Sequence, residues 1–343
     1  MLAHKGFKKS PTLMNVNMLR FSLALVIFSI LTITVIASWD TVIQGWNLLL
    51  EAKTSYAIMA LILAIFALVA QAEMMVVMLR SAGASVKRRD AYLTGMAANA
   101  WSSSLPGGAA LSVVVVFREQ KKWGVSSPMA SWYFLLSGVL SAVSIAVLGV
   151  ASILFFNFRV NEKYFALSIL TVVLLIALAF VFNARPSALK KFVLPPIAYV
   201  VQCLGRDPAC IVKKISNFIS QLSQVKISRR MLFYSFFLAF LNWSFEIVCL
   251  ILCAISVGVR IDILGIFISF VASKLAGQVQ VTPGGVGTVD AVLTSALLNF
   301  GSLSADEAIA IVVLFRLITF LFLSILGWIC FAFMKIRSSN PSG

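Results

Sequence analysis

The chain alternates between long apolar stretches and short polar connections. Six stretches consist almost entirely of apolar residues: 21–39, 55–79, 127–156, 164–182, 231–256 and 308–333. Each comes close to or exceeds the ~20 residues that a helix needs to cross ~30 Å of hydrocarbon. The pattern predicts an all-α polytopic membrane protein with about six transmembrane helices. The first stretch is longer than the ~7–15 apolar residues of a signal peptide, so we interpret it as an anchored helix.

Two further apolar regions, 91–117 and 263–299, are each interrupted by a Pro-Gly-Gly triplet. The triplets are Pro106-Gly107-Gly108 and Pro283-Gly284-Gly285. Ala91 to Leu105 would form only about 22 Å of helix at ~1.5 Å per residue, which is too short to cross a bilayer alone. Two short helices that meet at such a break either form a re-entrant hairpin, entering and leaving on one face, or a single kinked crossing.

The distribution of basic residues favours the hairpins. Cytoplasmic loops of membrane proteins carry an excess of Lys and Arg. With two re-entrant hairpins and both termini in the cytoplasm, 22 of the 28 Lys and Arg residues fall on the cytoplasmic side and 4 outside. The cytoplasmic set includes those of the tail 1–18 and of a basic linker, 183–230. If the triplets crossed instead, the linker would lie outside.

The spacing of these features indicates a duplicated unit. The two triplets lie 177 residues apart, and the apolar stretches before and after them repeat at nearly the same offset. Each half, 19–156 and 162–333 (which includes the linker), would contain three spans and one hairpin. Because three is an odd number, the second half would be inserted upside down. The sequence therefore predicts an inverted-topology repeat, and helix breaks at matching places in two such halves are typical of a transport site between them.

Composition and charge exclude several classes of function. Hydrophobic residues make up 61% and charged residues 12% of the chain, with mean hydropathy +1.00. The net charge of +16 is explained by topology, so no nucleic-acid partner is expected. The single histidine, His4, leaves no His-based catalytic or metal-ligand cluster, and no nucleotide-binding P-loop occurs. We expect no cofactor, no disulfide framework and no enzyme activity.

The candidate binding residues are polar or glycine residues at membrane depth. Ionisable side chains in spans are costly and suggest function by default, and glycine at a helix break lets an anion approach backbone N–H groups. The candidates are Asn99, Pro106, Gly107, Gly108, Arg118, Asn242, Glu246, Lys274, Pro283, Gly284, Gly285, Gly287, Asp290 and Arg316. The alternative is structural: Lys274–Asp290 or Glu246–Arg316 as ion pairs that hold helices together, Arg118 and Glu73 as interfacial charges, and the glycines as packing sites.

Several of these motifs resemble the lysylphosphatidylglycerol synthase/flippase transmembrane family, which is also the flippase region of multiple-peptide-resistance proteins. The matching segments are 282–291 (TPGGVGTVDA), Asn99 with 105–108 (LPGG), Arg118, 123–126 (WGVS) and 314–319 (LFRLIT), and the resemblance covers roughly 19–333. The chain departs from the family at Asp290, where glutamate is usual, and at Ala109-Ala110, which replace a glycine and an acidic residue. No soluble aminoacyl-transferase domain follows, so the resemblance implies a stand-alone transmembrane member that does not synthesise aminoacylated lipid.

Together these observations predict a lipid transporter of the flippase type, which moves a phosphate-bearing head group between leaflets. Its partner would be a membrane phospholipid or a polyprenyl-phosphate-linked lipid, and its location a bacterial plasma membrane. Lys274 and Arg316 would bind phosphate, while Asp290 or Glu246 would bind a cationic head group or a coupling proton. Two alternatives stay open: an intramembrane enzyme acting on a lipid phosphate, and a non-transporting partner subunit. Assembly into a homo-oligomer is also left open.

Overall fold

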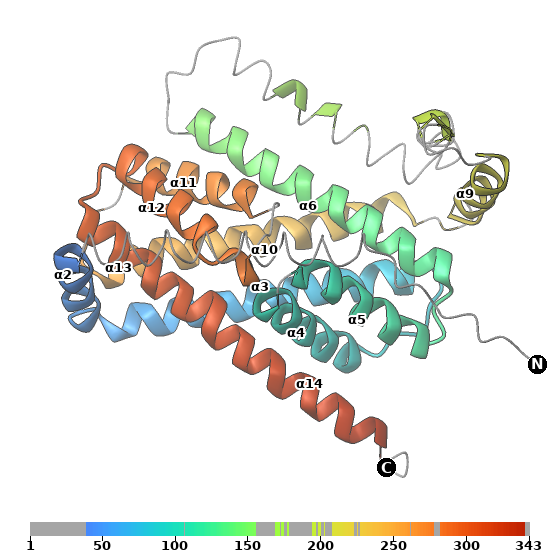
Figure 1. Cartoon of the computed structure of the whole chain (residues 1–343), viewed down its shortest axis with the longest axis horizontal. Coiled ribbons are helices and arrows are strands. Elements are labelled where there is room, and N and C mark those ends of the chain that lie inside the picture. Colours follow the sequence, from blue (N-terminus) through green and yellow to red (C-terminus); the bar gives the residue numbers. More distant parts are fainter. Residues whose placement is uncertain are drawn as a thin grey trace, which may run out of the picture.

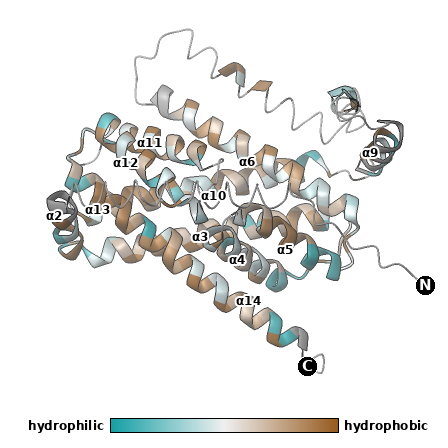
Figure 2. Cartoon of the chain, viewed as in Figure 1, coloured by the Kyte–Doolittle hydropathy of each residue, from teal (hydrophilic) through white to brown (hydrophobic). Residues whose placement is uncertain are grey.

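The computed structural model shows an all-α protein whose long helices run side by side (Figure 1). It describes residues 39–105, 107–155, 208–222, 227–260, 262–277 and 282–339, with isolated positions between 169 and 202 and Val225. Every regular element in these residues is helical. Several of the helices are strongly apolar along their length (Figure 2). The chain is therefore an all-α polytopic membrane protein, as the sequence predicts.

Four helices are long and apolar enough to cross a membrane. They are α3 (Thr54–Ser81), α6 (Ser127–Phe155), α10 (Arg229–Ser256) and the continuous run of α13 (Ala305–Arg316), η3 (Leu317–Phe322) and α14 (Leu323–Ser339). They match four of the six predicted spans. The other two, 21–39 and 164–182, lie almost entirely outside the described residues.

The same order of helices occurs in both halves. In the first half, α2 (Trp39–Leu50) and α3 are followed by the arms α4 (Arg88–Ser104) and α5 (Gly108–Lys122), and then by α6. In the second half, α9 (Pro208–Leu222) and α10 are followed by the arms α11 (Ile263–Ala276) and α12 (Thr288–Phe300), with the short 3-10 turn η2 (Pro283–Gly285) between them, and then by α13–α14. Each Pro-Gly-Gly triplet thus stands at a helix break between two short arms.

The helices α3 and α10 form the most extensive helix pair of the described core and run antiparallel. At one end, the Lys53 amide donates to the Ser256 carbonyl (2.8 Å) and the Ser256 hydroxyl donates to the Lys53 carbonyl (3.0 Å). At the other end, Arg80 of α3 and Arg230 of α10 line one groove. Corresponding helices that run in opposite directions are what an inverted repeat requires.

Each half also packs its last helix on the hairpin of the other half: α14 lies against α4, and α6 against α11. The α4–α5 and α11–α12 arms lie toward opposite ends of the molecule (Figure 1). Their breaks meet near its middle, because Gly284 of the second break lies beside the Ser103 carbonyl, just before the first break. This exchange of contacts places the region between the halves at the centre of the fold.

The membrane sides of the two hairpins stay a prediction that labelling can test. We expect single cysteines at Lys122 and Ser302, the outer ends of the two hairpins, to react with an impermeant thiol reagent from opposite faces. The variants would be made after replacing the native cysteines, three of which (Cys249, Cys253 and Cys330) are buried and free. Labelling of both positions from the same face of oriented vesicles would contradict the inverted repeat.

Candidate functional site

The second helix break is built on glycines in the left-handed backbone region. Gly284, Gly285 and Gly287 have φ of 57°, 69° and 89°, which only glycine adopts readily. A Cβ at Gly284 would lie 2.5 Å from Cε2 of Phe320 and 3.0 Å from the Ser103 carbonyl oxygen. Glycine at this position therefore lets the break lie directly against η3 and the end of α4.

The first break uses its glycines differently. Gly108 begins α5, and a Cβ there would lie 2.3 Å from the Trp101 carbonyl oxygen and 2.5 Å from that of Ser102. Its small size thus allows the two arms of the first hairpin to approach closely. Gly107 has φ of 67°, but a Cβ there would meet open space, so only its conformation requires glycine. Pro106 lies outside the described residues.

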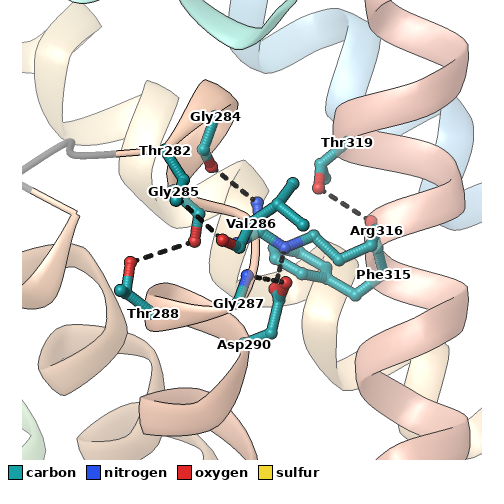
Figure 3. A network of polar contacts seen from close by, with 10 residues as sticks. All are labelled: Thr282, Gly284, Gly285, Val286, Gly287, Thr288, Asp290, Phe315, Arg316 and Thr319. Carbon is teal, nitrogen blue, oxygen red and sulfur yellow. Dashed lines mark hydrogen bonds and ion pairs between the residues drawn. The ribbon is translucent and has the colours of Figure 1, made fainter. Parts of the chain in front are cut away.

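Asp290 and Arg316 form an ion pair that closes the second break (Figure 3). Asp290, in the first turn of α12, accepts a hydrogen bond from the Gly287 amide at 2.9 Å and another from Nε of Arg316. Nη1 of Arg316 donates to the Gly284 carbonyl at 3.3 Å. Arg316 at the end of α13 is therefore fixed by a charge and by the broken backbone itself.

Lys274 and Glu246 form a second ion pair beside it. Lys274, in the last turn of α11, donates to the carboxylate of Glu246 on α10. Its Nζ also lies 5.2 Å from the ring centre of Trp243 and 5.0 Å from that of Phe270, within the range of cation–π attraction. An aromatic cage and a carboxylate together hold this ammonium group.

These pairs differ from the structural pairs considered from the sequence. The structural alternative paired Lys274 with Asp290 or Glu246 with Arg316, whereas the structure pairs Lys274 with Glu246 and Arg316 with Asp290. The physical reason lies in the helix break: Asp290 turns back to cap its own helix at Gly287 and faces α13, which leaves the end of α11 to face α10.

The two ion pairs border one cavity of about 180 Å³. Both halves contribute to its wall: Ala64, Ala67 and Leu68 of α3, Asn99, Ser102 and Ser103 of α4, Glu246, Ser273, Lys274, Gly284, Val289 and Leu293, and Phe315, Arg316, Thr319, Phe320 and Leu323. The predicted candidates Asn99, Glu246, Lys274, Gly284 and Arg316 thus meet around a single space, and Asp290 adjoins it through Arg316.

Two of the groups in this wall have hydrogen-bond donors without a partner. Within the described residues, Nδ2 of Asn99 and Nη2 of Arg316 are buried and make no hydrogen bond. A buried donor left unpaired costs about 1–3 kcal/mol, and more when it is charged, so such groups call for an explanation. Both are N–H donors, and they come from opposite halves of the molecule.

A second cavity of about 260 Å³ lies within the first half. It shares Asn99 and Ser102 with the first cavity, and none of its lining residues is charged. Its polar groups come from Gln71, Ser112, Tyr133 and Ser137 as well as the shared residues. Asn99 therefore stands between a charged space at the junction of the halves and a neutral polar space beside it.

Comparison with known proteins agrees with the motifs around these cavities. The family model of the lysylphosphatidylglycerol synthase transmembrane region matches residues 21–327. The chain belongs to this family. Among its relatives, a UPF0104 membrane protein of Methanothermobacter thermautotrophicus is 28% identical over 113 residues, and the UPF0104 membrane protein MJ1595 of Methanocaldococcus jannaschii is 24% identical over 140 residues. The alignments span 33% of both chains in the first case, and 40% of this chain and 41% of the relative in the second.

Not every candidate residue predicted from the sequence lines the cavity of this family member. Arg118 is exposed on α5, and Asn242 is buried one turn before Glu246 without lining the space. Gly107 and Gly108 shape the first hairpin, and Pro283, Gly285 and Gly287 shape the second, again outside the wall.

Sequence reasoning missed the hydroxyl groups of this wall. Ser102 and Ser103 precede the first break, and Ser103 shares a hydrogen bond of 2.6 Å with Ser324. A run of three serines, 102–104, directly before a break in an apolar segment was the signal. The π-helical turn η3 that follows Arg316 was missed as well, since no proline or glycine marks it. Such turns occur often at functional sites.

Proposed function

We propose that this family member moves a phosphate-bearing lipid head group between the two leaflets of its membrane. The observation that carries the proposal is the cavity between the halves, where Asn99 and Arg316 present buried, unpartnered donors. Two ion pairs border the same space. Membership of a family named for the membrane region of a lipid synthase supports a lipid-related role.

The size of the cavity suits a head group and not a whole lipid. Typical small-molecule pockets measure about 300–1,000 Å³, whereas this one measures about 180 Å³. A phosphate with its immediate substituents would enter the space, and the acyl or prenyl tails would stay in the bilayer. The hydroxyl groups of Ser102, Ser103 and Thr319 line the same wall and would accept or donate further hydrogen bonds.

The charges around the cavity balance, since Lys274 and Arg316 each face a carboxylate. A zwitterionic head group keeps that balance, because its phosphate replaces a carboxylate partner while its cation meets the released carboxylate. A purely anionic head group adds an uncompensated charge in a medium of low dielectric constant, which is expensive. Entry of one proton together with the anionic head group would restore neutrality, so transport of an anionic lipid would be coupled to protons.

Movement would follow from the arrangement of the halves. In transporters with inverted repeats, one half rocks against the other around a fixed site at their interface. Here Asn99 and Ser102 on α4 line both cavities, so displacement of α4 would open the charged space toward the neutral one. The α4 arm also packs on α14 of the other half, so motion of one half changes this wall.

Lipid binding tests the proposal, with Asn99→Leu as the variant. We expect native mass spectrometry of the purified protein to show co-purified phosphate lipid on the wild type and at least a tenfold reduction in Asn99→Leu, because the variant loses a buried donor at similar volume. Asn299→Leu, an exposed change on α12, is the matched control and should retain the lipid. Equal lipid on all three proteins would contradict the site.

The same sample separates transport from catalysis. Incubation with a polyprenyl diphosphate should release no inorganic phosphate if the protein only binds and moves the lipid. Release that depends on wild-type protein and is lost in Asn99→Leu would instead support an intramembrane enzyme.

A further inference from the structure

A second lipid-facing feature lies at one end of the α3–α10 pair, away from the central cavity. It is a groove of about 600 Å³ that shares no lining residue with either central cavity. Three arginines, Arg80, Arg88 and Arg230, come from the end of α3, the start of α4 and the start of α10. Apolar side chains, among them Val77 and Met231, line much of the remaining wall. We call this feature the arginine groove.

The walls of the arginine groove are apolar and open to the surroundings. Met231 is 43% exposed and Tyr234 is 44% exposed, although both belong to a membrane-spanning helix. On such a helix, exposed apolar side chains face acyl chains. The groove therefore combines an apolar wall suited to a lipid tail with basic groups suited to a head group.

The placement of Arg88 and Arg230 opposes the helix dipole, whereas Arg80 lies in the last turn of α3, where a cation is favourable. Arg88 is the first residue of α4, and Arg229 and Arg230 are the first two of α10. Helix N-termini carry partial positive charge, so cations there are unfavourable and anions are favourable. Positive-inside topology alone accounts for basic residues at this end of the protein, but it does not account for three guanidinium groups around one apolar groove.

The neighbouring groups leave the groove positively charged. Within its wall, Glu73 is the one carboxylate: it pairs with Arg88 at 2.9 Å and accepts a hydrogen bond from the Tyr92 hydroxyl at 2.5 Å. Arg80 is held in place by a hydrogen bond from its Nε to the Val86 carbonyl at 2.8 Å. Three arginines and one glutamate leave an excess of two positive charges, with Arg80 and Arg230 both exposed.

We propose that the arginine groove binds an anionic diacyl phospholipid of the adjacent leaflet. Its phosphate would lie between Arg80 and Arg230, and one acyl chain would lie along Val77 and Met231. Basic pockets between transmembrane helices are known to select anionic head groups. Because the groove bridges the ends of α3 and α10, which belong to different halves, the bound lipid would hold those ends together and make stability depend on anionic lipid content.

Thermal unfolding in mixed micelles tests the proposal. Full-length wild-type protein is titrated with phosphatidylglycerol or, separately, with phosphatidylcholine of the same chains. We expect a larger rise in melting temperature with phosphatidylglycerol. In Arg80→Gln/Arg230→Gln, the amount of phosphatidylglycerol needed for half of that rise should increase about 30-fold, since each basic residue near an anionic surface contributes about 1 kcal/mol and 1.4 kcal/mol corresponds to tenfold.

A matched variant makes the result specific. Lys121→Gln/Lys122→Gln removes the same charge from exposed positions at the end of α5 and should keep the wild-type response. A wild-type protein that does not distinguish the two lipids would overturn the proposal without any variant. So would an unchanged response in Arg80→Gln/Arg230→Gln, or an equal loss of the response in Lys121→Gln/Lys122→Gln.

Discussion

Arg316→Gln is expected to abolish lipid transport and also to destabilise the protein. Arg316 is partly buried and holds Asp290 and the Gly284 carbonyl. Breaking a buried ion pair costs about 3–5 kcal/mol because it leaves the other charge buried without a partner. The side chains here are 20% and 26% exposed, so we expect a loss toward the lower end of that range. Melting temperature and lipid translocation in proteoliposomes are the two measurements.

A charge-neutral double variant separates the two roles of this arginine. Arg316→Gln/Asp290→Asn also removes the carboxylate that the single variant leaves unpaired, so it should recover most of the stability and none of the transport. The exposed pair Arg337–Asp90, at 3.0 Å, is the matched control. Arg337→Gln/Asp90→Asn should change stability by about 0–1 kcal/mol and leave transport intact. Recovery of both properties by the central double variant would reduce Arg316 to a structural role.

Gly284→Ala is expected to have an effect nearly as large. Its left-handed backbone costs about 1–2 kcal/mol for a residue with a Cβ. The new methyl group would also lie 2.5 Å from Phe320 and 3.0 Å from the Ser103 carbonyl oxygen. Such overpacking adds about 1–3 kcal/mol. The added methyl group would push the break away from η3 and α4, which form two walls of the cavity. We therefore expect transport to fall at least a hundredfold.

Gly107→Ala is the control for this change, because it separates backbone strain from contact. Gly107 has a similar positive φ, 67°, but nothing lies within 4 Å of a Cβ there. Gly107→Ala should therefore lose only about 1–2 kcal/mol of stability, from backbone strain, and keep most of its transport. Equal loss of transport in both variants would show that the conformation of a glycine matters and its contact with η3 and α4 does not.

The elements of this fold could be predicted because the bilayer imposes simple rules on sequence. Apolar length predicted α3, α6, α10 and α13–α14, and the Pro-Gly-Gly triplets predicted both helix breaks. The charged ends of the first hairpin were harder to place, because apolar length indicates where a helix crosses hydrocarbon and not how far it extends into the interface: α4 begins at Arg88 and α5 continues to Lys122.

The central site could be predicted only in part. Membrane-depth charge identified Glu246, Lys274, Asp290 and Arg316, and the structure brings them to one region. The structure pairs them differently from the structural alternative, because pairing depends on which way each helix face turns after the break. Hydroxyl groups such as those of Ser103 and Thr319 gave little signal, since serine and threonine in membrane helices often bond back to their own helix: Thr319 donates to the Phe315 carbonyl at 2.7 Å.

We propose that a phosphate-bearing lipid changes leaflets through the cavity between the halves. Its most direct test is the rate at which a fluorescent phospholipid becomes accessible to an impermeant quencher in proteoliposomes. We expect fast exchange with the wild-type protein and exchange at the protein-free rate with folded Arg316→Gln/Asp290→Asn. Exchange by the wild type no faster than in protein-free liposomes, across zwitterionic, anionic and polyprenyl-phosphate lipids with and without a pH gradient, would contradict it.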